Sequence, residues 1–240
     1  MMAPLVIAPR FCGPPDSGNG GYACGLIADR LDGQAEITLR APPPLATPMT
    51  VEHRAGGSAR VLHGRTLVAE GTCLPGGLDM EPPGPVPLSE ARAAGARSRL
   101  RTHPEQHPFP SCFVCGPHRQ PGDGLRILPG PVTGRDLSAD VWYPDESLAG
   151  PDGYLRPEFV WAALDCPGAI GAIGEAPGAP AYLLGRFSAR QTGPVKTGEP
   201  YVVVGWRLGE DGRKLLAGSA LFTATGQLAA LARATWIRLK

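Results

Sequence analysis

The sequence predicts an α+β protein made of two similar halves, each with a central helix followed by a meander of antiparallel strands. Apolar residues at helical spacing mark one helix candidate in each half, over residues 19–31 and 156–173. Runs of alternating or continuous apolar residues, separated by Gly- and Pro-containing turns, follow each helix. RAPPPLATPMTVE at 40–52 and RQTGPVKTGEPYVVV at 190–204 share one order of features: an arginine ends a strand, a break with proline follows, and a new strand begins. This parallel indicates an internal repeat.

In the first half, the helix candidate is preceded by good N-cap residues, Asp16, Ser17 and Asn19. Small residues after the cap keep this helix slim enough to pack closely inside a curled sheet. Strands are expected over 35–40, 49–53, 59–63 and 65–70. No obvious strand precedes the helix, so this half is predicted to be abbreviated.

In the second half, Pro157 suits the first turn of the helix, whereas Pro167 is expected to kink the helix or to end its regular part. Strands are expected over 125–128, 137–143, 181–190, 199–208, 214–223 and 227–239. The Asp-Gly pair at 211–212 and the Thr-Gly pair at 225–226 predict hairpin turns between the last three strands.

The predicted domain organisation has three parts. Residues 1–75 form an N-terminal unit, residues 76–108 form a linker rich in Pro and Gly, and residues 109–240 form a C-terminal unit. Within the linker, SEARAAGARSRL reads as a short polar helix capped by Ser89.

The bulk composition describes a folded protein without a charged binding surface. The chain has 240 residues, of which 42% are hydrophobic and 19% charged, with 23 basic against 22 acidic residues. This balance gives no electrostatic footprint for nucleic acid or for a membrane surface. No run approaches the ~20 apolar residues of a membrane span, and the N-terminus does not read as a signal peptide. We therefore expect a cytoplasmic protein whose six scattered cysteines are reduced.

Three sequence segments resemble hotdog-fold thioesterases of the phenylacetate-pathway type. CFVCGP at 112–117, followed by Gly124-Leu125, resembles an opening that in this family often reads C-F-x-C-G, then N-P, then G-L. HRQPGD stands between the two parts here, so the Asn of the pattern is missing. WAALDCPGA at 161–169 resembles the family's acid-bearing central helix, and SGNGGYACGLIA at 17–28 resembles the start of the same helix. The resemblance covers most of the chain outside 76–108 and implies a double hotdog, each half a long central helix wrapped by an antiparallel β-sheet.

The resemblance implies hydrolysis of an acyl-CoA or acyl-carrier thioester. The unpaired N–H groups and positive dipole end of a helix can polarise a thioester carbonyl. Gly20 and Gly21 leave the start of the first helix uncrowded, and Asn19 either caps that helix or donates its amide to the substrate. Asp165, about two turns into the second helix, is the candidate base or nucleophile.

Comparison of the two helices predicts one complete site and one degenerate site. The first helix has the Gly-Gly start, but Ala28 stands where the acid should be, with Asp29 one place off. The second helix has Asp165, but an Arg-Pro-Glu start at 156–158. A site shared between the units therefore combines Gly20 and Gly21 with Asp165. The alternatives are purely structural roles. Asn-Gly-Gly is then only a capped turn, and Asp165 is only a carboxylate on the helix surface or a partner for an arginine.

Other candidate residues are assigned less specific roles. Tyr22 and Trp161 are candidates for substrate binding, since Trp161 lies one turn before the acid. The C-x-x-C pair, Cys112 and Cys115, is expected to be structural, with a zinc site or a redox pair as alternatives; zinc would need four ligands. We expect neither a cofactor nor a metal.

Two other functions compete with hydrolysis. One is a non-catalytic acyl- or CoA-binding module, favoured by the missing Asn of the pattern and by the absence of a His before Gly20. The other is a dehydratase or hydratase, which usually needs an Asp/His pair that neither helix shows. The architecture also predicts a homodimer or a higher homo-oligomer, and four arginines are candidates to meet CoA phosphates: Arg54, Arg60, Arg65 and Arg119.

Overall fold

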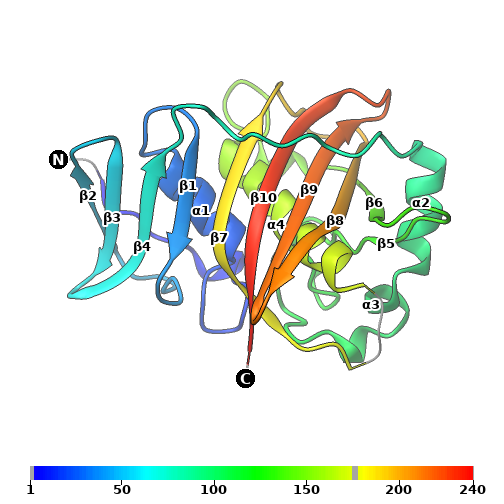
Figure 1. The fold of residues 1–240 in the computed structure, drawn as a ribbon, viewed down its shortest axis with the longest axis horizontal. Helices are drawn as coiled ribbons and strands as arrows, with labels where there is room; N and C mark the ends of the chain where they lie inside the picture. Colours follow the sequence, from blue (N-terminus) through cyan, green and yellow to red (C-terminus); the bar gives the residue numbers. More distant parts are fainter. Residues whose placement is uncertain (1–2, 175–177, 240) are drawn as a thin grey trace.

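One antiparallel sheet runs through the whole molecule (Figure 1). The computed structural model of the chain describes residues 3–174 and 178–239, and within them ten strands pair in the order β2-β3-β4-β1-β7-β10-β9-β8-β6-β5. The strands are β1 (Ala35–Leu39), β2 (Thr50–Arg54), β3 (Ser58–His63), β4 (Thr66–Cys73), β5 (Gly130–Pro131), β6 (Ser138–Trp142), β7 (Tyr182–Gln191), β8 (Tyr201–Asp211), β9 (Lys214–Thr223) and β10 (Leu228–Arg238).

Two helices lie side by side on one face of this sheet (Figure 1). They are α1 (Gly20–Ala28) in the first half and α4 (Pro157–Ile173) in the second. Between them and the sheet lies the main apolar core, to which both halves contribute. Burial of this apolar surface is the main stabilising term of the fold.

The two halves meet through a continuous strand pair. β1 pairs antiparallel with β7, with Ile37 opposite Phe187, so the sheet of the first half continues into that of the second. In each half, the segment before the helix also forms a hydrogen bond with the loop that follows the first strand after that helix. In the first half the Ala46 N–H donates to the Ile7 carbonyl over 2.8 Å, and in the second the Leu155 N–H donates to the Val195 carbonyl over 2.8 Å. Both halves therefore have a bond between these two segments, although the donor lies on opposite sides of the pair.

The segment between the halves packs in part on the opposite face of the sheet. It contains α2 (Leu88–Arg97), α3 (Arg99–Thr102) and the 3-10 turn η2 (Pro104–Gln106); two further 3-10 turns are η1 (Pro9–Phe11) and η3 (Glu146–Leu148). Ala91 and Ala94 of α2 are fully buried in a second apolar cluster with side chains of β8, β9 and β10. α2, which the sequence indicates as a short polar helix, therefore contributes apolar side chains to the core. The unit boundaries near residues 75 and 108 stay a prediction.

Several sequence predictions about the helices need correction. α1 has nine residues against 17 in α4, so only the second half has a long central helix. Ser89 does not cap α2, because the N-cap is Pro87 and Ser89 lies in the first turn. Pro167 does not end α4, which continues to Ile173. α4 packs tightly on the sheet at this proline, because a Cβ atom on Gly205 of β8 would lie 1.9 Å from the Pro167 carbonyl oxygen. This packing keeps the helix regular past Pro167.

The predicted strand over 125–128 is also wrong. The segment is irregular, because its N–H groups bond elsewhere: Leu125 donates to the Phe113 carbonyl over 2.8 Å, and Ile127 donates to the Val114 carbonyl over 2.9 Å. The remaining predicted strands agree with the structure to within a few residues. The two predicted hairpin turns are confirmed, with positive φ angles of 58° at Gly212 and 84° at Gly226.

Candidate functional site

The N-terminus of α1 is capped by Asn19, as the sequence predicted. The Asn19 Oδ1 atom accepts a hydrogen bond from the Tyr22 N–H over 2.9 Å, and the side chain is buried. This bond satisfies one of the N–H groups that have no partner within the helix. The Asn19 Nδ2 group does not take part in this cap and points toward α4.

Glycines allow α1 to touch α4 directly. A Cβ atom on Gly21 would lie 2.4 Å from the Asp165 Cβ atom and 2.9 Å from the Trp161 carbonyl oxygen. One turn later, a Cβ on Gly25 would lie 2.7 Å from the Glu158 Cα atom. Only glycine permits this approach at both positions, so the Gly-Gly start fixes the distance between the helices.

Asp165 lies at this contact and is almost fully buried, with 1% of its surface exposed. Its Oδ2 atom accepts from the Gly21 N–H over 2.9 Å and from the Asn19 Nδ2 group over 2.8 Å. Its Oδ1 atom is buried, and no donor from the described residues bonds to it. Burial raises the pKa of Asp165 to about 7, while the bonds from Gly21 and Asn19 oppose the rise. A buried carboxyl with one unpartnered oxygen is a feature that purely structural carboxylates rarely have.

Gly20 supplies the remaining donor of the first helical turn. The Gly21 N–H is bonded to Asp165, the Tyr22 N–H to the Asn19 side chain and the Ala23 N–H to the Asn19 carbonyl. Among the described residues, no acceptor receives the Gly20 N–H. Gly20 also lines a cavity.

A cavity of about 910 Å³ opens beside the Asp165–α1 contact. This volume is in the range of pockets that hold small molecules and cofactors. Its walls are mainly apolar and include Leu39, Leu100, Phe109, Ile170, Leu184 and Trp236. Asp165 borders the cavity although it is 1% exposed, so its carboxyl lies at the floor, beneath its neighbours.

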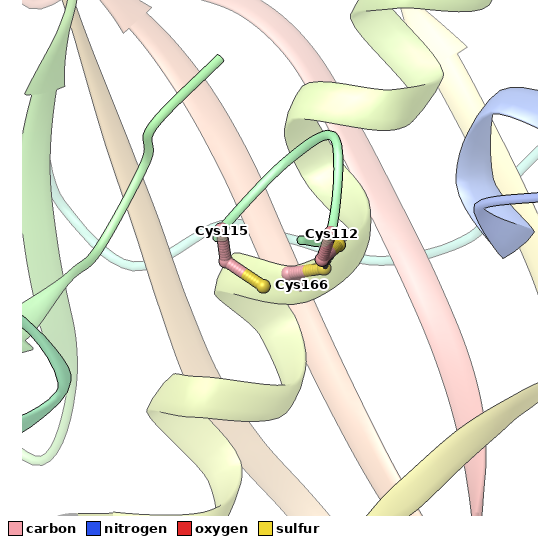
Figure 2. A group of neighbouring side chains, drawn as sticks. All are labelled: Cys112, Cys115 and Cys166. Atoms are coloured by element: carbon pink, nitrogen blue, oxygen red, sulfur yellow. Dashed lines mark hydrogen bonds between the residues drawn. The ribbon is translucent and has the colours of Figure 1, made fainter. Parts of the chain in front are cut away.

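Three buried cysteines border the same cavity, and Figure 2 shows them grouped together. Cys112 and Cys115 come from the loop of the C-x-x-C motif, Cys166 follows Asp165 on α4, and the three sulfur atoms lie within 4.8 Å of one another. His107 is close by, with its Nε2 atom 3.2 Å from the Cys115 Sγ atom. The sequence did not predict this cluster, because Cys166 and His107 carry no motif that links them to the C-x-x-C pair.

Tyr22 and Trp161, the predicted substrate-binding residues, do not line the cavity. The Tyr22 ring stacks on Phe11 with a centroid distance of 4.3 Å, inside a group of four aromatic rings. Trp161 packs edge-on against Phe187 at 5.5 Å. Both side chains are buried core residues. Their location argues against contact with a substrate in this cavity.

The start of α4 differs from that of α1, as the sequence indicated. Pro157 occupies the first turn and has no N–H to offer. Arg156 pairs with Glu158 over 3.4 Å and lies over the Phe159 ring. This helix start is therefore filled by its own side chains.

Replacing Gly21 with alanine is expected to lower the free energy of unfolding by about 1–3 kcal/mol, because the added methyl group forces α1 away from α4. Urea denaturation measures this change. Gly76→Ala is the matched control, because no atom lies within 4 Å of the position of its added Cβ. Equal stability of the two variants would contradict the direct helix contact.

Comparison with known proteins supports the fold. No family model and no curated protein matches the sequence. Among solved structures, 98% of the chain superposes on 94% of a candidate thioesterase from Novosphingobium aromaticivorans, with a TM-score of 0.59 and 16% identity. A TesB protein from Mycobacterium avium subsp. paratuberculosis matches over 95% of this chain and 90% of its own, with a TM-score of 0.58 and 13% identity.

Both similarities extend across the two halves of the chain. The protein therefore has the double hotdog fold that the sequence predicted. At these identities the likeness concerns the fold, and function has to be argued from the site. No helix in the described part of the chain is long and apolar enough to cross a membrane.

Proposed function

We propose that this protein hydrolyses an acyl thioester, with acyl-CoA or an acyl-carrier protein as the substrate class. One observation carries the proposal: Asp165 of the second half meets the N-terminus of α1 of the first half at the floor of an apolar cavity. The two parts that thioester hydrolysis needs, a carbonyl polariser and a carboxylate, are thus contributed by different units.

The carbonyl oxygen of the thioester binds the Gly20 N–H. This group lies at the positive end of α1 and borders the cavity. A preorganised donor of this kind stabilises the developing oxyanion by roughly 3–4 kcal/mol. The sequence also predicts the Gly21 N–H as a donor to the carbonyl oxygen, but this N–H donates to the Asp165 carboxyl.

Asp165 acts as a general base. Its Oδ2 atom is fixed by two donors, which leaves Oδ1 to accept a proton from water. The water oxygen then bonds to the thioester carbon, the carbon–sulfur bond breaks, and the proton passes to the leaving thiolate. Because only 1% of Asp165 is exposed, a small water molecule reaches it more readily than a thioester carbon would. General-base catalysis is therefore favoured over direct attack.

The apolar cavity walls suit the acyl group. Leu39, Ile170 and Leu184 offer hydrocarbon contacts beside the Gly20 N–H. The two full-length structural matches, described as a candidate thioesterase and a TesB protein, agree with this substrate class. Of the arginines suggested for CoA phosphates, Arg119 is committed elsewhere, since it bonds to Asp123 and to two backbone carbonyls.

A non-catalytic acyl- or CoA-binding role is the second candidate. The near-complete burial of Asp165 and the use of the Gly21 N–H as its partner favour it. In this case the cavity binds the acyl group, and the carboxyl only joins α1 to α4. A dehydratase role lacks an Asp/His pair, since no hydrogen bond joins Asp165 to a histidine among the described residues.

Thiol release from a panel of short, long and aromatic acyl-CoAs tests the proposal, together with binding of the same compounds measured by calorimetry. Turnover of at least one class supports thioester hydrolysis. Binding without release supports the binding module, and absence of both contradicts the assignment of the cavity. The cytoplasmic location and the homodimer remain predictions.

A further inference from the structure

The three cysteines lie close enough together to share one metal ion as thiolate ligands. The Cys112 and Cys166 Sγ atoms are 3.8 Å apart, and all three sulfurs lie within 4.8 Å of one another (Figure 2). Zinc–sulfur bonds of 2.3 Å in a tetrahedral site place two sulfurs about 3.8 Å apart. All three cysteines are free and buried, so no disulfide competes for them in this structure.

The C-x-x-C loop is built to hold its two sulfurs in place. The Gly116 N–H donates to the Cys112 carbonyl over 2.8 Å and closes the turn. A Cβ atom on Gly116 would lie 2.4 Å from that carbonyl oxygen, so the turn requires glycine.

His107 supplies another donor to the cluster. The Phe109 N–H donates to the His107 Nδ1 atom over 3.0 Å, so the ring proton of neutral His107 is on Nε2. That N–H points at the Cys115 Sγ atom 3.2 Å away. His107 therefore donates to the Cys115 sulfur and is not itself placed as a ligand. Partners of this kind orient metal ligands and tune their basicity.

Asn19 completes the polar surroundings. Its Nδ2 atom, which donates to Asp165, also lies 3.9 Å from the Sγ atoms of Cys112 and Cys166. The thiol cluster thus contacts the same amide that fixes the carboxyl of the proposed active site. Because the three cysteines line the cavity, one side of the cluster faces it.

We propose that Cys112, Cys115 and Cys166 bind one zinc ion as thiolates, with a fourth coordination position open to a ligand from the cavity. Binding releases the thiol protons to solvent, and no oxidant is required. Zinc sites with three protein ligands keep the fourth position for water or another small ligand, whereas structural zinc sites have four protein ligands. This assignment goes beyond thioester hydrolysis and does not depend on it.

The test measures zinc stoichiometry and affinity in the full-length, reduced protein. Purified chain is reconstituted with Zn²⁺, and a chromophoric chelator competes for the ion. Sulfur-to-metal charge-transfer absorption after Cd²⁺ substitution reports thiolate ligation. The expected result is one ion per chain, with charge-transfer absorption that is lost in Cys115→Ser and in Cys166→Ser.

Two controls separate ligation from general effects of losing a cysteine. Cys24→Ser removes another buried cysteine, and Cys73→Ser removes a half-buried one; both should keep the wild-type stoichiometry. His107→Ala should weaken zinc binding about 10–100-fold while keeping the charge-transfer band. This variant replaces the ligand variants in the test if those do not fold. The proposal is overturned if the reduced wild type binds no zinc, or if Cys24→Ser loses as much zinc as Cys115→Ser. A wild-type zinc affinity in His107→Ala would overturn the role of His107.

Discussion

Replacing Asp165 with asparagine is expected to lower kcat for thioester hydrolysis by about 10²–10⁴-fold, the range typical of losing a general base. Asparagine keeps the side-chain volume and can still accept hydrogen bonds from Gly21 and Asn19 through its carbonyl oxygen. It cannot take a proton from water at neutral pH. Thiol release under saturating acyl-CoA measures the change, and circular dichroism verifies the fold.

Glu158→Gln is the matched control for this substitution. Glu158 is also a buried carboxylate on α4, but it lies near Gly25 and does not line the cavity. Its replacement is expected to leave kcat within a few-fold of the wild type. Equal activity of Asp165→Asn and wild type would remove Asp165 from the chemistry and favour the binding module.

Replacing Asp140 with alanine is expected to lower the free energy of unfolding by about 3 kcal/mol, at the lower end of the 3–5 kcal/mol range for breaking a buried ion pair. The lower end applies because the Arg101 side chain is 38% exposed, while that of Asp140 is 7% exposed. The Asp140 Oδ2 atom accepts from Arg101 over 2.7 Å and from the buried Leu128 N–H over 2.8 Å. Its loss detaches the helical segment between the halves from β6 and leaves a backbone donor unsatisfied.

Asp123→Ala provides the comparison for Asp140. Asp123 pairs with Arg119 over 2.9 Å, but its side chain is 44% exposed, so its removal is expected to cost less than about 1 kcal/mol. Urea denaturation of both variants measures the difference. Similar losses in the two variants would show that the Asp140 network does not hold the segment.

The sequence predicted the fold well where local patterns are strong. The strands that became β7–β10 are long, apolar and separated by turn residues, so their position could be read within a few residues. The segment 125–128 was misread because its apolar residues pair with the C-x-x-C loop and not with a neighbouring strand. The predicted helix runs past the end of α1 at Ala28, because the N–H groups of Arg30 and Leu31 bond to carbonyls three residues back and not four.

Part of the site could be predicted because the two halves could be compared. The Gly-Gly start in one helix and the acid in the other indicated a shared site, and the structure brings Gly21 and Asp165 into hydrogen-bonding contact across 144 residues of sequence. Their catalytic roles stay predictions.

The thiol cluster could not be predicted in the same way. Cys112 and Cys166 are 54 residues apart, and only the packing of the C-x-x-C loop on α4 brings them together. His107 sits in a Pro-rich segment without periodicity, where local patterns give no position.

The most direct test of the shared site is a crystal structure with an acyl-CoA analogue in which a methylene group replaces the thioester sulfur. Our account predicts the acyl chain in the cavity, the carbonyl oxygen within hydrogen-bonding distance of the Gly20 N–H, and the Asp165 carboxyl facing the carbonyl carbon. An analogue bound at the start of α4, or one bound with its carbonyl remote from both Gly20 and Asp165, would contradict it.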